Sequence, residues 1–161
     1  MENQVQQTPQ ENAAFAAMRR AKGRGVVIDA GFAAHVHTDF TVFGSAVKSG
    51  VLPDVISTDL TRFSAFFRGG RYGMTMCMSM ALHFGMEEAD IFRAVTSAPA
   101  AALGKAGQWG EMKVGGPADL AVLRFGDEGF CLTDKAGNRA ESKKGYRCLL
   151  TVTDGQIVYK D

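Results

Sequence analysis

The sequence predicts an α/β fold in which parallel βα units are followed by a small β module. Two apolar runs, Val26–Ala30 and Asp54–Thr58, read as strands and flank a helical segment at Phe40–Lys48. Strand, helix and strand in this order imply parallel pairing through a right-handed crossover. After Gly110 the chain changes to short apolar runs separated by Gly and Asp, which is typical of antiparallel strands. The chain has 161 residues. A complete eight-unit α/β barrel takes roughly 200 to 250, so we expect at most part of one.

The amino-terminal region predicts one helix and one strand. Residues 1–10 are polar and rich in Gln and Asn, and we expect a disordered lead-in there. Asn12 can cap a helix over Ala13–Lys22 with Phe15 on its apolar face. The run Val26–Ala30 is apolar without alternation, which predicts a strand buried on both faces.

The middle of the chain predicts helices. The Met-rich stretch from Met74 to Met80 is interpreted as a helix, because Met and Ala are good helix formers. Its sulfur atoms could hold Cu(I), but methionines on a helix far more often fill an adaptable core. Further helical segments are expected at Glu87–Thr96 and Pro99–Leu103. We therefore expect residues 11–109 to form the α/β part and residues 110–161 to form the β module.

Four apolar runs define the predicted strands of the β module. The pair Asp154-Gly155 between the last two runs is a strong signal for a tight hairpin. The strands are expected at Leu120–Phe125, Phe130–Thr133, Tyr146–Thr153 and Gln156–Tyr159.

Composition excludes several classes of protein. A net charge of +1 gives no basic footprint for nucleic acid. No apolar stretch reaches membrane-spanning length. The three cysteines are widely spaced without a C-x-x-C pair, which argues against a disulfide framework and against a zinc knuckle, and suits a reducing compartment. We expect a soluble, cytoplasmic protein without nucleic-acid or membrane partners.

Asp59 is the residue most suited to chemistry. It comes at the end of the apolar run that begins at Val55, and a carboxylate that follows a parallel strand lies where an α/β barrel places its active site. The strand fixes the direction of the residue, and the loop leaves its head free. By pattern alone, an aspartate at this place more often caps the next turn of the chain.

Three motifs place the chain in a family. They are PDVISTDLTR at residues 53–62, VTSAPAAALG at residues 95–104 and GGPADLAV at residues 115–122. Together they resemble the carboxy-terminal part of the metal-dependent amidohydrolase superfamily, in its dihydroorotase-like and deacetylase-like branch, from about Arg24 onwards. The resemblance implies the terminal βα units of a (βα)8 TIM-type barrel followed by a small β-sandwich-like module.

The resemblance also implies a function. A member of this family hydrolyses an amide or cyclic amide C–N bond of a small molecule with zinc as its metal, and Asp59 matches the aspartate that binds the metal and takes up a proton. Phe32 stands where this branch leads us to expect a histidine. The family's other metal ligands come from earlier barrel strands that the motifs do not cover. The alternative is a non-catalytic remnant that acts as a structural or interaction domain.

Three further residues are weaker candidates. His35 and His37 lie at i and i+2 on an extended segment and could bind zinc together. They are close to Asp59 in sequence, whereas the family separates such ligands by nearly a whole barrel, so we interpret both as ordinary loop residues in preference to metal ligands. Arg62 could meet a substrate carboxylate, although a solvated arginine is the commoner case.

Two βα units alone leave strand edges open. The apolar sides of Val27 and Ile56 are expected to face the missing part of the barrel, where they would lack neighbours. We therefore expect self-association or a partner chain.

Overall fold

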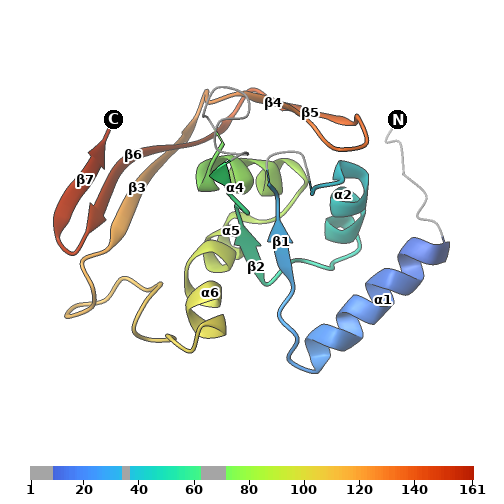
Figure 1. Ribbon diagram of the computed structural model, residues 1–161, viewed down its shortest axis with the longest axis horizontal. Coiled ribbons are helices and arrows are strands. Elements are labelled where there is room, and N and C mark those ends of the chain that lie inside the picture. The colour runs from blue at the N-terminus through green and yellow to red at the C-terminus, as the bar shows by residue number, and fades with distance from the viewer. Residues whose placement is uncertain (1–8, 34–36, 63–71) are drawn as a thin grey trace.

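A short parallel sheet lies at the centre of the molecule, with helices around it and antiparallel strands along one side and across the top (Figure 1). The computed structural model describes residues 9–33, 37–62 and 72–161. The elements in chain order are α1 (Pro9–Gly23), β1 (Asp29–Gly31), α2 (Phe40–Lys48), β2 (Val55–Ser57), α4 (Met74–His83), α5 (Glu88–Val95), α6 (Ser97–Ala102), β3 (Leu120–Gly126), β4 (Phe130–Thr133), β5 (Arg139–Ser142), β6 (Gly145–Thr153) and β7 (Gln156–Lys160).

The predicted strand–helix–strand unit is present. β1 and β2 pair in parallel, with Asp29 opposite Val55 and Gly31 opposite Ser57, and α2 joins them. Asp54 ties the start of this unit together, because its carboxylate binds Lys22 at 2.8 Å and accepts a hydrogen bond from the Ile28 N–H. Burial opposes ionisation of this carboxyl, yet these partners hold its pKa below the ordinary value.

The first strand is shorter and more exposed than predicted. It begins at Asp29, and Val26 and Val27 are about half exposed, so the expectation of a strand buried from Val26 was wrong. The Val26 N–H donates to the Ala21 carbonyl in the turn that ends α1. Because the Val26 N–H is bonded in that turn, it cannot pair with a neighbouring strand, and β1 begins only at Asp29.

The amino-terminal helix starts earlier than expected. α1 begins at Pro9, which suits proline because the first helical position needs no N–H partner. The predicted apolar face is confirmed: Phe15 is buried against Ala46 and Val51. This contact packs α1 onto α2.

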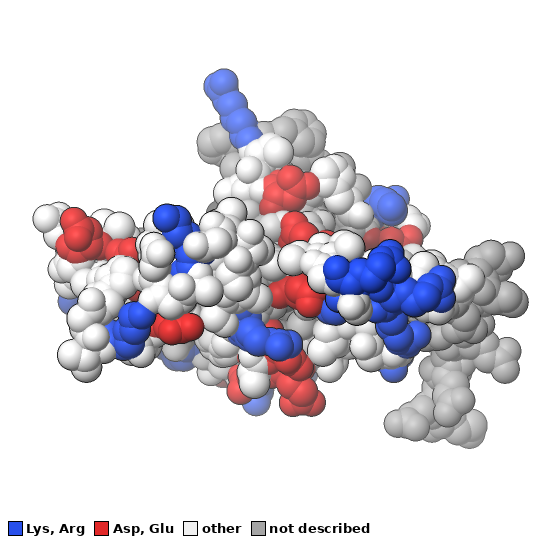
Figure 2. Space-filling view, turned by 90° about the horizontal axis from the view of Figure 1, so that it is seen from below, with Lys and Arg blue, Asp and Glu red and all other residues white. Residues whose placement is uncertain are grey.

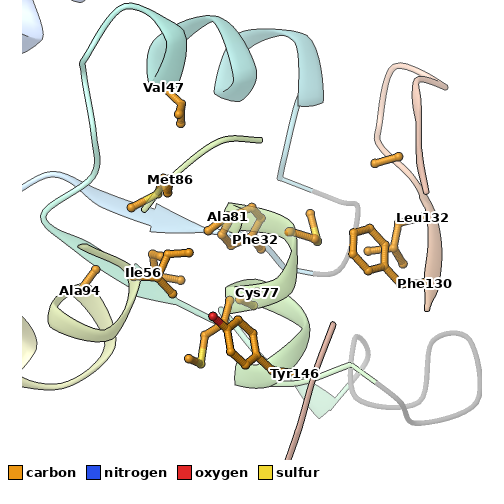
Figure 3. Packing of buried hydrophobic residues seen from close by; sticks show 14 of the residues in the cluster. Phe32, Val47, Ile56, Cys77, Ala81, Met86, Ala94, Phe130, Leu132 and Tyr146 are labelled. Atoms are coloured by element: carbon orange, nitrogen blue, oxygen red, sulfur yellow. The ribbon is translucent and has the colours of Figure 1, made fainter. Parts of the chain in front are cut away.

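One hydrophobic cluster joins the central sheet, the helices and the β strands (Figure 3). The Met-rich helix α4 supplies its centre, since Cys77, Met78 and Met80 are almost fully buried, as the core interpretation predicted. Ile56 of β2 is also buried in this cluster, beside the helices. The expectation that Ile56 faces the missing barrel was therefore wrong, because side chains alternate along a strand and position 56 points to the helix layer.

The antiparallel strands form two sheets, ordered β3–β6–β7 and β4–β5. The hairpin at Asp154-Gly155 is confirmed, with positive φ angles at both residues, as a tight primed turn requires. β5 was not predicted, because Arg139–Ser142 is polar and contains no β-branched residue. Tyr146 of β6 anchors the larger sheet to the helices: its N–H donates to Ser79 Oγ over 2.8 Å, and its hydroxyl donates to Glu88 over 2.7 Å.

Asp134 connects the β4–β5 hairpin to α2. Its carboxylate accepts hydrogen bonds from the N–H groups of Ala136 and Asn138 and from the Asn138 side chain inside the turn, and from the Phe40 N–H at 2.7 Å. The last of these is at the amino terminus of α2, so one buried carboxylate closes a turn and caps a helix. The segment between Thr38 and Phe40 is thereby held in place.

Charged groups of both signs are distributed over the surface. The view from below shows basic groups gathered over α1, whose last turn carries Arg20 and Lys22 (Figure 2). Among the residues that the structure describes, no helix combines the length and the apolar character needed to cross a lipid bilayer.

Candidate functional site

Asp59 comes two residues after β2 ends and has a left-handed backbone, with φ of 47°. This region is costly for a residue with a Cβ, and residues held there are found preferentially at functional sites. Ala33, in the loop that follows β1, is a second residue of this kind, with φ of 42°. The side chain of Asp59 is 41% exposed, so its carboxylate is open to solvent.

His37 contacts the carboxylate of Asp59. Its Nδ1 atom lies 2.5 Å from Asp59 Oδ2. The neighbouring Thr38 holds the segment in place, because its buried hydroxyl donates to the Phe32 carbonyl over 2.7 Å. Nδ1 is directed at the carboxylate, and the His37 side chain is 59% exposed.

The sequence interpretation of His37 as an ordinary loop residue, in preference to a metal ligand, did not predict this pair. The signal that could have found it is topological. The loops that leave the carboxyl ends of adjacent parallel strands lie at the same edge of the sheet. His37 follows β1, Asp59 follows β2, and β1 pairs with β2.

The face of the sheet that carries Asp59 is polar. Because side chains alternate, Asp29, Gly31 and Ser57 share a face, and Ser57 Oγ donates to Asp29 Oδ2 over 2.7 Å. A Cβ on Gly31 would lie 3.5 Å from the Cβ of Asp59. The absence of a side chain at position 31 therefore leaves room beside the candidate carboxylate. Ser57 and Asp29 were not predicted as part of the site.

Two donors fix the carbonyl that precedes Asp59. The Thr58 oxygen accepts hydrogen bonds from the Ala33 N–H at 3.0 Å and from the Tyr72 hydroxyl at 2.9 Å. The thiol of Cys77 in turn donates to the Tyr72 oxygen over 3.4 Å. Burial raises the pKa of the Cys77 thiol to about 11, which keeps it protonated and able to donate at neutral pH.

At about pH 8, near the pKa of an ordinary cysteine, iodoacetamide should modify Cys131 in the folded protein and leave Cys77 unmodified. Cys131 is exposed, whereas Cys77 is fully buried with a raised pKa. Peptide mass spectrometry measures the modification at each site. In denaturant both residues should react. Equal rates of modification in the native protein would contradict the burial of Cys77.

The described residues do not form a complete metal site. Within residues 9–33, 37–62 and 72–161, no group of three or more His, Cys, Asp and Glu side chains could hold a metal ion. A hydrolytic zinc site takes three protein ligands, and two ligands of a tetrahedral zinc lie about 3.3 Å apart. His37 Nδ1 and Asp59 Oδ2 are closer than that and are hydrogen-bonded to each other. His37 and Asp59 are residue types that can bind zinc. They are one ligand short of a hydrolytic zinc site, and their donor atoms are too close together to bind the same ion.

The other predicted site residues are not brought to this pair. His35 lies outside the described residues. Arg62 is exposed three positions beyond Asp59, and the structure gives it no partner among the described residues. Phe32, which stands where a histidine was expected, is fully buried in the core with its ring against Phe43.

A cavity of about 340 Å³ opens beside His37. Polar groups of Asp29, Asp39 and Lys135 line it together with the apolar side chains of α1 and α2. A larger cavity of about 610 Å³ lies between α4, α5 and β3, and none of the candidate residues line it. The smaller cavity is thus adjacent to His37 of the candidate pair.

The chain matches the amidohydrolase family over residues 8–158. It belongs to this family. It is also 30% identical over 142 residues to a deacetylase from Enterococcus faecalis (strain ATCC 700802 / V583), a match that covers 86% of this chain and 37% of the deacetylase. The chain therefore spans little more than a third of the length of that relative.

Two solved structures are similar in fold to this amidohydrolase chain. An adenine deaminase superposes with a TM-score of 0.76 and 29% identity, over 89% of this chain and 38% of the deaminase. A dihydroorotase superposes with a TM-score of 0.79 over 92% of this chain and 40% of the dihydroorotase, and its 24% identity supports a common fold alone. The predicted family is confirmed.

Proposed function

We propose that this chain contributes the carboxy-terminal part of the active site of a metal-dependent hydrolase that cleaves amide or cyclic amide C–N bonds of small molecules. The observation that carries the proposal is the contact between Asp59 and His37 at the carboxyl ends of two paired parallel strands. The relatives named deacetylase and adenine deaminase support a reaction at a C–N bond. β1 and β2 would then be the last two strands of a barrel, followed by a small β module.

Asp59 would act as the proton carrier of this reaction. Its free oxygen accepts a proton from the attacking water, and the same carboxyl then delivers the proton to the leaving nitrogen. His37 holds Oδ2 through Nδ1, so it directs the other oxygen of Asp59 outward. The left-handed backbone at Asp59 and the missing side chain at Gly31 keep the carboxylate accessible.

Zinc is the metal that we propose, and it would supply an activated water at neutral pH. The donors present in the described residues are too few to hold it, so His35 or donors from further barrel strands would have to complete the site. Arg62 would meet an anionic group of the substrate. We place the protein in the cytoplasm.

The test of the metal role is thermal unfolding with and without zinc. Zinc at a hundredfold excess over its dissociation constant should stabilise the wild-type chain by about 2.7 kcal/mol. Asp59→Asn should weaken zinc binding by about 10- to 100-fold, and so lose between about half and about five sixths of this stabilisation at the same zinc concentration. Without zinc, the variant should unfold within about 1 kcal/mol of the wild type, because Asn tolerates positive φ and only one half-exposed hydrogen bond weakens.

Asp154→Asn is a matched control for this experiment. Asp154 is also an aspartate with positive φ, 50°, but it lies in the β6–β7 turn. The control variant should respond to zinc as the wild type does. A wild-type chain that zinc leaves unchanged would defeat a metal site held by this chain alone, and would leave the metal role to donors from further barrel strands.

The chain as printed should hydrolyse N-acetyl amino acids and dihydroorotate at the background rate, even with added zinc. A hydrolytic site takes three protein ligands, and the described residues supply two donors that bind each other. The measurement is a product assay by liquid chromatography. Turnover that Asp59→Asn abolishes would show that the chain alone completes the site, and would promote His35 to a ligand.

The chain is also expected to associate. β7 is exposed along its whole length, Val26 and Val27 are about half exposed, and burying one such side chain is worth about 1.5 to 3 kcal/mol. We propose that a second copy or another polypeptide covers these surfaces. Light scattering at micromolar concentration should give a mass above that of one chain, and a stable monomer would contradict the expectation.

A further inference from the structure

The carbonyl of the peptide group between Thr58 and Asp59 is held by residues from other parts of the fold. The Thr58 carbonyl accepts one hydrogen bond from the loop after β1, through Ala33, and one from the hydroxyl of Tyr72, which precedes α4. The Thr58 side chain accepts a third hydrogen bond, from the Leu60 N–H at 3.2 Å. The chain is therefore fixed immediately on either side of Asp59.

These bonds determine the direction of the Asp59 side chain. The peptide group is planar, so the orientation of the Thr58 carbonyl also sets the orientation of the Asp59 N–H. The rotation about the bond between the Asp59 nitrogen and its Cα is φ, which is 47° here. The left-handed region is unfavourable for a residue with a Cβ and persists only where the surroundings impose it. The donors that fix the Thr58 carbonyl therefore help to hold Asp59 in the left-handed conformation.

Tyr72 is itself well placed for this task. Its ring packs against the main core, and its hydroxyl lies between the Thr58 carbonyl and the thiol of Cys77. Cys77 is fully buried in α4 and donates to the Tyr72 oxygen, which leaves the hydroxyl proton of Tyr72 directed at Thr58. A chain of contacts thus runs from the core helix to the backbone of the candidate carboxylate.

We propose that Tyr72 is a positioning residue, whose hydroxyl holds the Thr58–Asp59 peptide so that the Asp59 carboxylate meets His37. The role matters for catalysis only if the proposed function of Asp59 holds. The geometric claim itself is independent of any metal or substrate.

The test compares Tyr72→Phe with Tyr146→Phe. Each removes the hydroxyl of one tyrosine that packs against the core and hydrogen-bonds there, but Tyr146 donates to Glu88, away from the site. The readout is the pair of ¹⁵N chemical shifts of the His37 ring, observed through its carbon-bound protons in the metal-free protein. Asp59→Gly gives the reference for a lost contact, since glycine tolerates the positive φ.

Tyr72→Phe should move the Nδ1 resonance of His37 in the direction that Asp59→Gly does, and Tyr146→Phe should leave it in place. In an Asp59→Gly background, Tyr72→Phe should cause no further shift. Cys77→Ala is the second variant, and it should give a smaller shift in the same direction even if Tyr72→Phe folds poorly. An unchanged resonance in both Tyr72→Phe and Cys77→Ala would overturn the proposal. Because no zinc is present, that result would leave the zinc-linked unfolding test of Asp59 unaffected.

Discussion

Replacement of Asp134 by alanine should lower the free energy of unfolding by roughly 3 kcal/mol, because it leaves the buried Phe40 N–H and two partly buried N–H groups of the turn without an acceptor. The carboxylate accepts hydrogen bonds from two N–H groups of its own turn and from the Phe40 N–H, and it is 4% exposed. The thermal midpoint should fall by roughly 10 °C for a chain of this size. Thermal unfolding followed by circular dichroism measures the change.

The pH dependence of this contribution has a definite sign. Burial of Asp134 opposes ionisation, but the hydrogen bonds from Phe40, Asn138 and Ala136 hold its pKa below the ordinary value. The unfolded chain therefore binds the proton first as pH falls. The stabilisation is present at neutral pH and is lost below about pH 4, towards the lower pKa of the folded state.

Asp127→Ala is the matched control, since Asp127 is an exposed aspartate in the turn before β4. Its effect should lie within about 0.5 kcal/mol. Asp134→Ala removes the acceptor of the Phe40 N–H, and Phe40 and Thr38 lie on the segment that carries His37. The substitution should therefore also weaken the contact between His37 and Asp59. Equal stabilities of the two variants would show that Asp134 does not hold the hairpin to α2.

Gly110→Ala should destabilise the fold by about 2 to 5 kcal/mol, from the left-handed backbone and from a steric clash together. The φ angle of Gly110 is 76°, and a Cβ there would lie 2.5 Å from the Thr96 carbonyl oxygen. That oxygen cannot move freely, because it accepts a hydrogen bond from the Ala100 N–H in α6. The measurement is urea unfolding at equilibrium.

Gly115→Ala separates the two causes. Gly115 has a similar φ of 78°, but no atom lies within 4 Å of the position of its Cβ. It should cost about 1 to 2 kcal/mol, from the backbone alone. If Gly110→Ala lowers the free energy of unfolding no more than Gly115→Ala does, the close approach of position 110 to Thr96 does not contribute to the loss of stability.

Local patterns predicted those elements whose signals lie within a few neighbouring residues. The helix Phe40–Lys48 and the hairpin at Asp154-Gly155 were predicted where they occur, because amphipathic spacing and turn residues act over short distances. The hydrophobic pattern gave wrong predictions where a contact with another segment of the chain determines the local structure. Val26 reads as part of a strand, but the end of α1 uses its N–H, and β5 is polar because only Ala140 of that strand is buried.

The sequence by itself determined the family, the parallel strand pair and the place of Asp59 at its end, since the motifs and the strand–helix–strand order are local properties of the chain. Only the tertiary structure decided what Asp59 meets. His37, Tyr72 and Gly31 come from three other segments, and their positions beside Asp59 depend on how β1, β2 and α4 pack. Residues distant in sequence meet through pairing of strands and burial of apolar faces, and spacing along the chain does not record which loops those forces bring together.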